Sequence, residues 1–102
     1  MKTIRIKKAN NIKEKMIGFI GKQESYPLLI ETHFGIHTFG VKFPIDVLVL
    51  DNLHKVISLR ENLKPNRIFL WNIKHNKVLE LPQKTIKEKN LKVGDIIKII
   101  LE

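Results

Sequence analysis

The sequence predicts a mainly β protein (α+β class), built as a small sandwich or a partly closed barrel of about seven short strands. Two observations lead to this prediction. From Pro27 onward, short apolar runs recur between Gly, Pro, Asn and Asp turn signals. A single stretch near the N-terminus has a helical period instead. The 102 residues are enough for one core and too few for two, so we expect a single domain over residues 1–102.

Near the N-terminus the pattern predicts a strand followed by a short helix. Residues 3–7 alternate, with Ile4 and Ile6 on one face. After a cap at residue 10 or 11, the apolar side chains fall on one helical stripe formed by Ile12, Met16, Phe19 and Ile20. We expect Gly18 to lie inside this helix for a packing reason and Gly21 to end it.

Further strands are expected at residues 28–30, 36–41, 45–50, 55–59, 68–71, 77–81 and 96–101. The run 45–50 follows Pro44 and is apolar on both faces except at Asp46, which is typical of a central strand. Residues 51–52 are expected to form a hairpin turn and residues 62–66 a loop. Pro82 should stop strand pairing, residues 85–89 should form one or two helical turns, and Gly94-Asp95 should form a turn.

The charge suggests nucleic-acid binding, but the residue types argue against a specific interaction. Nineteen basic residues against ten acidic ones give +9 and a pI near 9.9. Sixteen of the basic residues are lysine, and lysine, isoleucine and asparagine make up 40 of the 102 residues, as an AT-rich genome would produce. Direct base readout favours arginine, and single-strand binding favours aromatic platforms between basic residues. We therefore interpret most of the charge as a solvated lysine surface.

Several classes of protein are excluded or disfavoured by what the sequence lacks. It contains no cysteine, which excludes disulfides, thiolate zinc sites, iron–sulfur clusters and cysteine nucleophiles. It contains no apolar run near the roughly 20 residues of a membrane span, and charges interrupt its N-terminus, so we expect a cytoplasmic protein. No cofactor is expected. No metal is expected either, since His33 and His37 would lie roughly 13 Å apart in an extended chain.

Four ordered motifs resemble those of a known family. Residues 36–47, Ile-His-Thr-Phe-Gly-Val-Lys-Phe-Pro-Ile-Asp-Val, are similar to the central signature of the family called domain of unknown function 192. Residues 15–22, 78–82 (Val-Leu-Glu-Leu-Pro) and 91–95 (Leu-Lys-Val-Gly-Asp) agree with it in order and spacing. Lys84 stands where the family usually has a glycine, and Val41 where it has a methionine. The resemblance implies a compact β-rich fold with a short N-terminal helix, and it implies no activity.

Three polar residues in these motifs are candidates for function. Asp46 is either a general acid or base, or, as we prefer, a carboxylate that ties a loop to the sheet. Glu80 shares a strand face with Val78 and is expected to form an exposed salt bridge. His37 is expected to be a hydrogen-bonded structural residue on an apolar face.

These residues leave three hypotheses for function. The preferred one is a non-catalytic binding or interaction module, with a concave patch near His37, Phe39 and Asp46, and with Trp71 as an aromatic candidate. Its partner would be a small molecule or a protein. The second is a small hydrolase that uses Asp46 with His37 or Glu80. The third is a basic protein that associates with nucleic acids without sequence preference.

Overall fold

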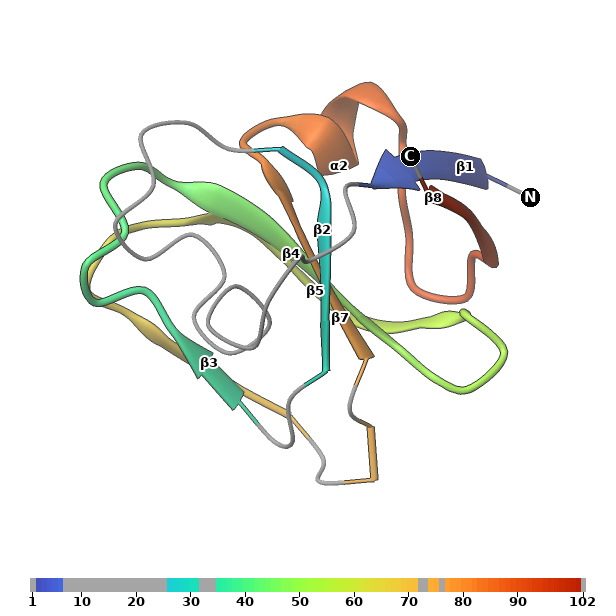
Figure 1. The fold of residues 1–102 in the computed structure, drawn as a ribbon, viewed down its shortest axis with the longest axis horizontal. Helices are drawn as coiled ribbons and strands as arrows, with labels where there is room; N and C mark the ends of the chain where they lie inside the picture. Colours follow the sequence, from blue (N-terminus) through green and yellow to red (C-terminus); the bar gives the residue numbers. More distant parts are fainter. Residues whose placement is uncertain (1, 7–25, 32–34, 72–73, 76, 102) are drawn as a thin grey trace.

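Two small sheets pack on opposite faces of a central four-stranded sheet in the computed structural model (Figure 1). The structure describes residues 2–6, 26–31, 35–71, 74–75 and 77–101. The helix expected around residues 10–21, with Gly18 and Gly21, lies outside the described residues, as does His33.

The central sheet has the order β2-β7-β4-β5, and its neighbouring strands are antiparallel. Its strands are β2 (Leu28–Glu31), β4 (Ile45–Leu50), β5 (Val56–Leu63) and β7 (Lys77–Pro82). All six residues of β4 are buried, because β4 lies between two other strands and is covered on both faces. This confirms the central strand that the apolar run predicted.

The two ends of the chain cover one face of the central sheet. β1 (Lys2–Ile6) and β8 (Ile97–Leu101) form a parallel pair, and the one-turn helix α2 (Thr85–Glu88) lies on the same side of the molecule (Figure 1). The core on this side consists of Ile4, Ile6, Leu48, Leu50, Val56, Leu79, Leu81, Ile86, Leu91 and Ile97.

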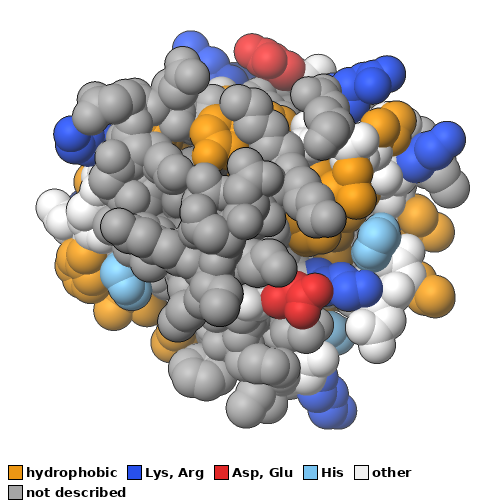
Figure 2. All heavy atoms as spheres, in the orientation of Figure 1, with side chains coloured by type: hydrophobic (Ala, Val, Ile, Leu, Met, Phe, Trp, Pro, Cys, Tyr) orange, Lys and Arg blue, Asp and Glu red, His pale blue; other side chains and the backbone are white. Residues whose placement is uncertain are grey.

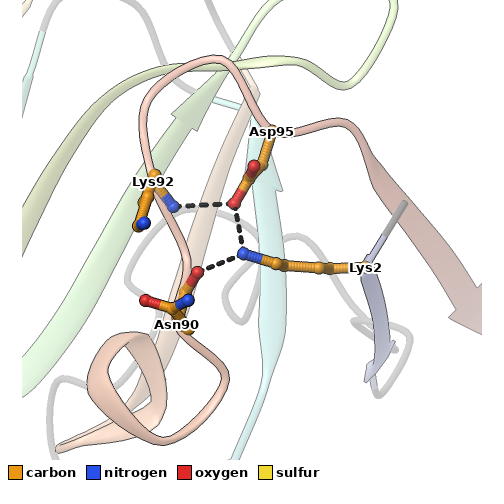
Figure 3. A network of polar contacts seen from close by, with 4 residues as sticks. All are labelled: Lys2, Asn90, Lys92 and Asp95. Carbon is orange, nitrogen blue, oxygen red and sulfur yellow. Dashed lines mark hydrogen bonds and ion pairs between the residues drawn. The ribbon is translucent and has the colours of Figure 1, made fainter.

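A polar network holds β1 to the loop before β8 (Figure 3). Lys2 Nζ donates to Asp95 Oδ2 at 2.7 Å and to the carbonyl of Asn90, and the Lys92 N–H donates to the same Asp95 oxygen at 2.8 Å. Gly94, in the expected turn, has a φ of 98°, which glycine adopts without a steric cost. The hydrogen bond from Lys2, with that from the Lys92 N–H, lowers the pKa of Asp95 below its usual 3.8.

The other face of the central sheet is covered by β3 (Gly35–His37) and β6 (Ile68–Leu70), an antiparallel pair. Here the core consists of Leu28, Ile30, Val41, Ile45, Val47, Leu63 and Val78, with Tyr26, Ile36, Phe43, Phe69 and Trp71 packed against it. The mainly β class is confirmed, with eight strands and one short helix among the described residues. Its three sheets do not close into a barrel there.

Two strands end several residues from where they were expected, and β7 includes Pro82, which pairs with Ile45 although it was expected to stop pairing. The strand expected at 36–41 ends at His37, because residues 38–40 turn back: the Val41 N–H donates to the Thr38 carbonyl at 3.1 Å, and Gly40 has a φ of 86°. β5 continues to Leu63 through part of the loop expected at residues 62–66. Its extension contains a bulge, because the register of β4 and β5 shifts between Ile45 and Val47.

Candidate functional site

Asp46 joins three separate segments of the chain. Its side chain is 1% exposed and points to the same face of β4 as Leu48 and Leu50. Oδ1 accepts the backbone N–H of Asn62 at 2.9 Å, and Oδ2 accepts that of Ile86 at 2.8 Å. Both carboxylate oxygens therefore bind backbone donors, as expected for a structural tie.

The two motifs that carry Asp46 and Lys84 meet at this point. Lys84 is the N-cap residue of α2, has a φ of 75° and makes no side-chain cap bond; Asp46 instead binds the N–H of Ile86 in the first turn. On the other side, Asp46 lies opposite the bulge residues Glu61 and Asn62, and Asn62 has a φ of 53°. The left-handed conformation of Lys84 explains why a glycine suits this position.

An open hollow of about 200 Å³ lies beside Asp46. Its lining residues are Asp46, Glu61, Asn62, Gln83, Lys84 and Lys87. The Gln83 amide donates to Asn62 Oδ1 at 2.8 Å, which links the two walls. The lining contains two carboxylates and two ammonium groups, so their formal charges cancel.

Glu80 does not share a site with Asp46. The Cα atom of Glu80 is paired with that of Val47, whose side chain points to the opposite face of β4 from Asp46. The expectation of an exposed residue was wrong, because the side chain of Glu80 is only 5% exposed. Burial follows from the position of β7, which lies between β2 and β4.

His37 belongs to the sheet on the other face of the central sheet from the Asp46 side chain, and it lies close to Phe39. The side chain of His37 is exposed at the end of β3, and its ring centroid lies 5.4 Å from that of Phe39. Trp71 is half-buried beneath the same small sheet; its indole N–H donates to the carbonyl of His75 at 2.8 Å, and its ring contacts Phe69. The structure therefore separates the expected patch into a carboxylate tie at Asp46 and an aromatic surface at β3 and β6.

The outer surface of β3 and β6 is strongly apolar. Phe39, Ile68 and Leu70 are 48%, 61% and 65% exposed, and Ile68 lies directly opposite His37 across the strand pair. We call these four residues, His37, Phe39, Ile68 and Leu70, the β3–β6 face. Figure 2 shows hydrophobic side chains beside a histidine at the left edge of the molecule, and others at the right edge.

Thr38 supports this face, and the sequence pattern did not indicate its role. Its side chain is completely buried, its hydroxyl donates to the carbonyl of Lys64 at 2.6 Å, and it accepts the N–H of Arg67 at 2.8 Å. The Thr38 N–H also donates to the Arg67 carbonyl at 2.9 Å. One threonine thus fixes the loop before β6 against the turn after β3.

The two segments that contain the β3–β6 face carry positive charge and no negative charge. Residues 32–45 and 62–79 contain neither aspartate nor glutamate, although ten such residues occur elsewhere in the chain. The same two segments contain five cationic residues, Lys42, Lys64, Arg67, Lys74 and Lys77. The basic residues are spread along the whole chain, as expected, whereas the acidic residues are absent from these two segments.

The described part of the chain contains neither a metal-binding cluster nor a membrane-spanning helix. No three His, Cys, Asp or Glu side chains there gather closely enough to hold a metal ion. No helix among those residues has the length and apolar character needed to cross a membrane.

The described residues thus form a small, mainly β protein of three sheets, in which Asp46 joins separate segments and an apolar face is exposed. The chain belongs to the DUF192 family, described as an uncharacterized ACR, whose sequence profile matches residues 1–99. This confirms the family that the four motifs indicated. No curated protein matches the chain.

Two solved structures have the same fold. One is a candidate transcription regulator from Sinorhizobium meliloti 1021, with a TM-score of 0.77, 18% identity, and coverage of 89% of this chain and 78% of the other. The second is a protein of unknown function from Novosphingobium aromaticivorans DSM 12444, with a TM-score of 0.72, 14% identity, and coverage of 92% and 70%. At these identities the likeness shows the fold alone.

Proposed function

We propose that this protein is a non-catalytic binding module and that the β3–β6 face is its contact surface for another protein. The observation that carries the proposal is the exposure of Ile68 and Leu70 on the outer side of one small sheet, next to the exposed Phe39, whose ring lies against His37 in the turn after β3. Single exposed apolar side chains are common on protein surfaces, whereas apolar side chains gathered on one face mark interaction sites.

The position of Asp46 favours this proposal over the hydrolase alternative. A general acid or base must reach the substrate with a free lone pair or a proton. Asp46 is buried and directs both oxygens to backbone N–H groups, and Glu80 lies on the other face of the sheet. His37 belongs to the small sheet that covers the other face of the central sheet from the Asp46 side chain.

A second candidate function is non-specific association with nucleic acids. The charge of +9 and the two segments without carboxylates support it, and one structural neighbour is described as a candidate transcription regulator. Such binding would depend on phosphate neutralisation, so its affinity for an oligonucleotide should fall by about 10³-fold or more between 50 and 200 mM salt.

A site-specific photo-crosslink tests the proposed function. The photoreactive residue p-benzoylphenylalanine replaces Phe39 in one variant and Leu53 in the control, because Leu53 is 78% exposed but belongs to the turn between β4 and β5. We expect a discrete protein adduct in cells from position 39 and none from position 53. Equal labelling from both positions, or an adduct removed by nuclease, would contradict the proposal.

A further inference from the structure

Among the described residues, no other strand pairs with the outer edge of β6. At the end of the β3–β6 ladder the Thr38 N–H donates to the Arg67 carbonyl, and the Arg67 N–H donates to the Thr38 hydroxyl. Because bonded and non-bonded pairs alternate in an antiparallel ladder, Phe69 is bonded to β3, whereas the N–H and C=O groups of Ile68 and Leu70 point away from it. Within the described residues this sheet has two strands, so β6 is at its edge.

The three residues of this edge include no lysine or proline, and no bulge interrupts their pairing with β3. Natural proteins protect exposed strand edges with lysine, proline, bulges or a covering segment, because unpaired edge groups pair readily with another chain. β6 has the sequence Ile-Phe-Leu, and the side chains of Ile68 and Leu70 are mostly exposed. A strand added here would find backbone partners and apolar side chains at the same two residues.

The side-chain surface next to the edge is continuous. The Leu70 side chain lies over Gly35, so that a Cβ atom at residue 35 would be 2.6 Å from Leu70 Cδ2. Ile68 lies beside His37, whose ring contacts Phe39. Alternate side chains of an added strand would therefore lie along one apolar strip, which favours apolar residues at every second position of the partner.

The charge around the edge selects the partner. Lys64 and Arg67 lie in the loop before β6 and Lys74 follows it, and residues 32–45 and 62–79 contain no carboxylate. A second copy of the chain would bring like charges together, which disfavours self-association through this face. Aliphatic side chains such as Ile68 and Leu70 are poor stacking platforms for bases, which disfavours single-stranded nucleic acid.

We infer that the β3–β6 face binds an acidic, extended segment of another protein, which adds as a strand to the outer edge of β6. This inference rests on the proposed function and specifies its partner. Main-chain hydrogen bonds to Ile68 and Leu70 supply the affinity, and apolar and acidic side chains of the segment supply the specificity.

Selection from a random library of 12-residue peptides tests this inference on the full chain. The library is first depleted on the double variant Ile68→Ser/Leu70→Ser and then selected on the wild type; melting curves confirm that both proteins are folded. We expect enriched peptides to alternate apolar residues with an excess of Asp and Glu. A synthetic copy should bind the wild type and Leu53→Ser equally, and the double variant about tenfold more weakly or worse.

Methylation of the peptide backbone distinguishes strand addition from other modes of binding. N-methylation of every second residue in one register should abolish binding, and in the other register it should not, because only one set of N–H groups faces β6. Peptides without acidic excess, or binding that is insensitive to the double variant or to methylation, would overturn the inference. If position 39 then still crosslinks to a protein, the proposed function stands; if both experiments fail, both proposals are wrong.

Discussion

Replacement of Asp46 by alanine measures the contribution of the carboxylate tie to stability. The change removes the acceptors of two backbone donors: the Ile86 N–H, which is buried, and the Asn62 N–H, which is partly buried. A buried donor left unpaired costs about 1–3 kcal/mol, and a donor that water can reach costs near the lower limit. We therefore expect Asp46→Ala to lower the free energy of unfolding by about 2–4 kcal/mol.

Urea unfolding followed by far-UV circular dichroism and by the fluorescence of Trp71, the single tryptophan, gives this value. Asp46→Asn keeps one acceptor oxygen but turns an amide N–H toward the second donor, so it should cost about half as much. Glu61→Ala is the matched control, because Glu61 is an exposed carboxylate in the same hollow; its effect should stay within about 0.5 kcal/mol. Stabilisation by Asp46→Ala would refute the structural role, since functional groups often lower stability.

Three further predictions concern the turn before α2, the contact of β1 with the loop before β8, and the contact of Thr38 with the loop before β6. Lys84→Gly should raise the free energy of unfolding by about 0.5–1 kcal/mol, because Lys84 has a positive φ. Lys87→Gly, within α2, should lower the free energy of unfolding by about as much. Urea melts of both variants check these two values. The pKa of Asp95 is lowered in the folded state, so its contribution to stability is present at pH values well above its usual pKa of 3.8 and is lost as the pH falls through its folded pKa. The stability difference between wild type and Asp95→Asn should shrink over that range, and a difference that does not change would contradict the role of the Lys2–Asp95 pair. Thr38→Val should cost about 1–3 kcal/mol and increase hydrogen exchange of the Arg67 amide, and an unchanged exchange rate would refute the hydroxyl contact.

The central strand and the small helix could be predicted from local patterns. Residues 45–50 are apolar on both faces, and only a strand with neighbours on both sides and cover on both faces buries such a run. The α2 turn follows from Pro82 and the polar residues after it. The end of β3 was missed, because the alternation of His37, Phe39 and Val41 continues through a turn that depends on a buried hydroxyl and on Gly40.

The candidate site was predicted in its residues but not in its arrangement. The sequence places Asp46 and Glu80 in neighbouring motifs, and both looked available for one polar cluster. Their separation depends on the register of β4 against β7, which pairs Glu80 with Val47 and leaves the side chain of Asp46 on the opposite face. A shift of β7 by one residue against β4 would have brought both carboxylates to one face of the sheet, because side chains alternate along a strand.

Local periodicity and short motifs were enough to predict the mainly β class, the central strand, the family and the burial of Asp46, because each of these depends on residues close together in the chain. Which distant segments meet depends on the tertiary packing. β1 pairs with β8, Asp46 accepts the N–H of Ile86, and β3 pairs with β6, which forms an exposed edge. These contacts join residues 26 to 95 positions apart, such as Thr38 with Lys64 and Lys2 with Ile97. These contacts depend on which elements cover each face of the central sheet, and no short stretch of sequence carries that information.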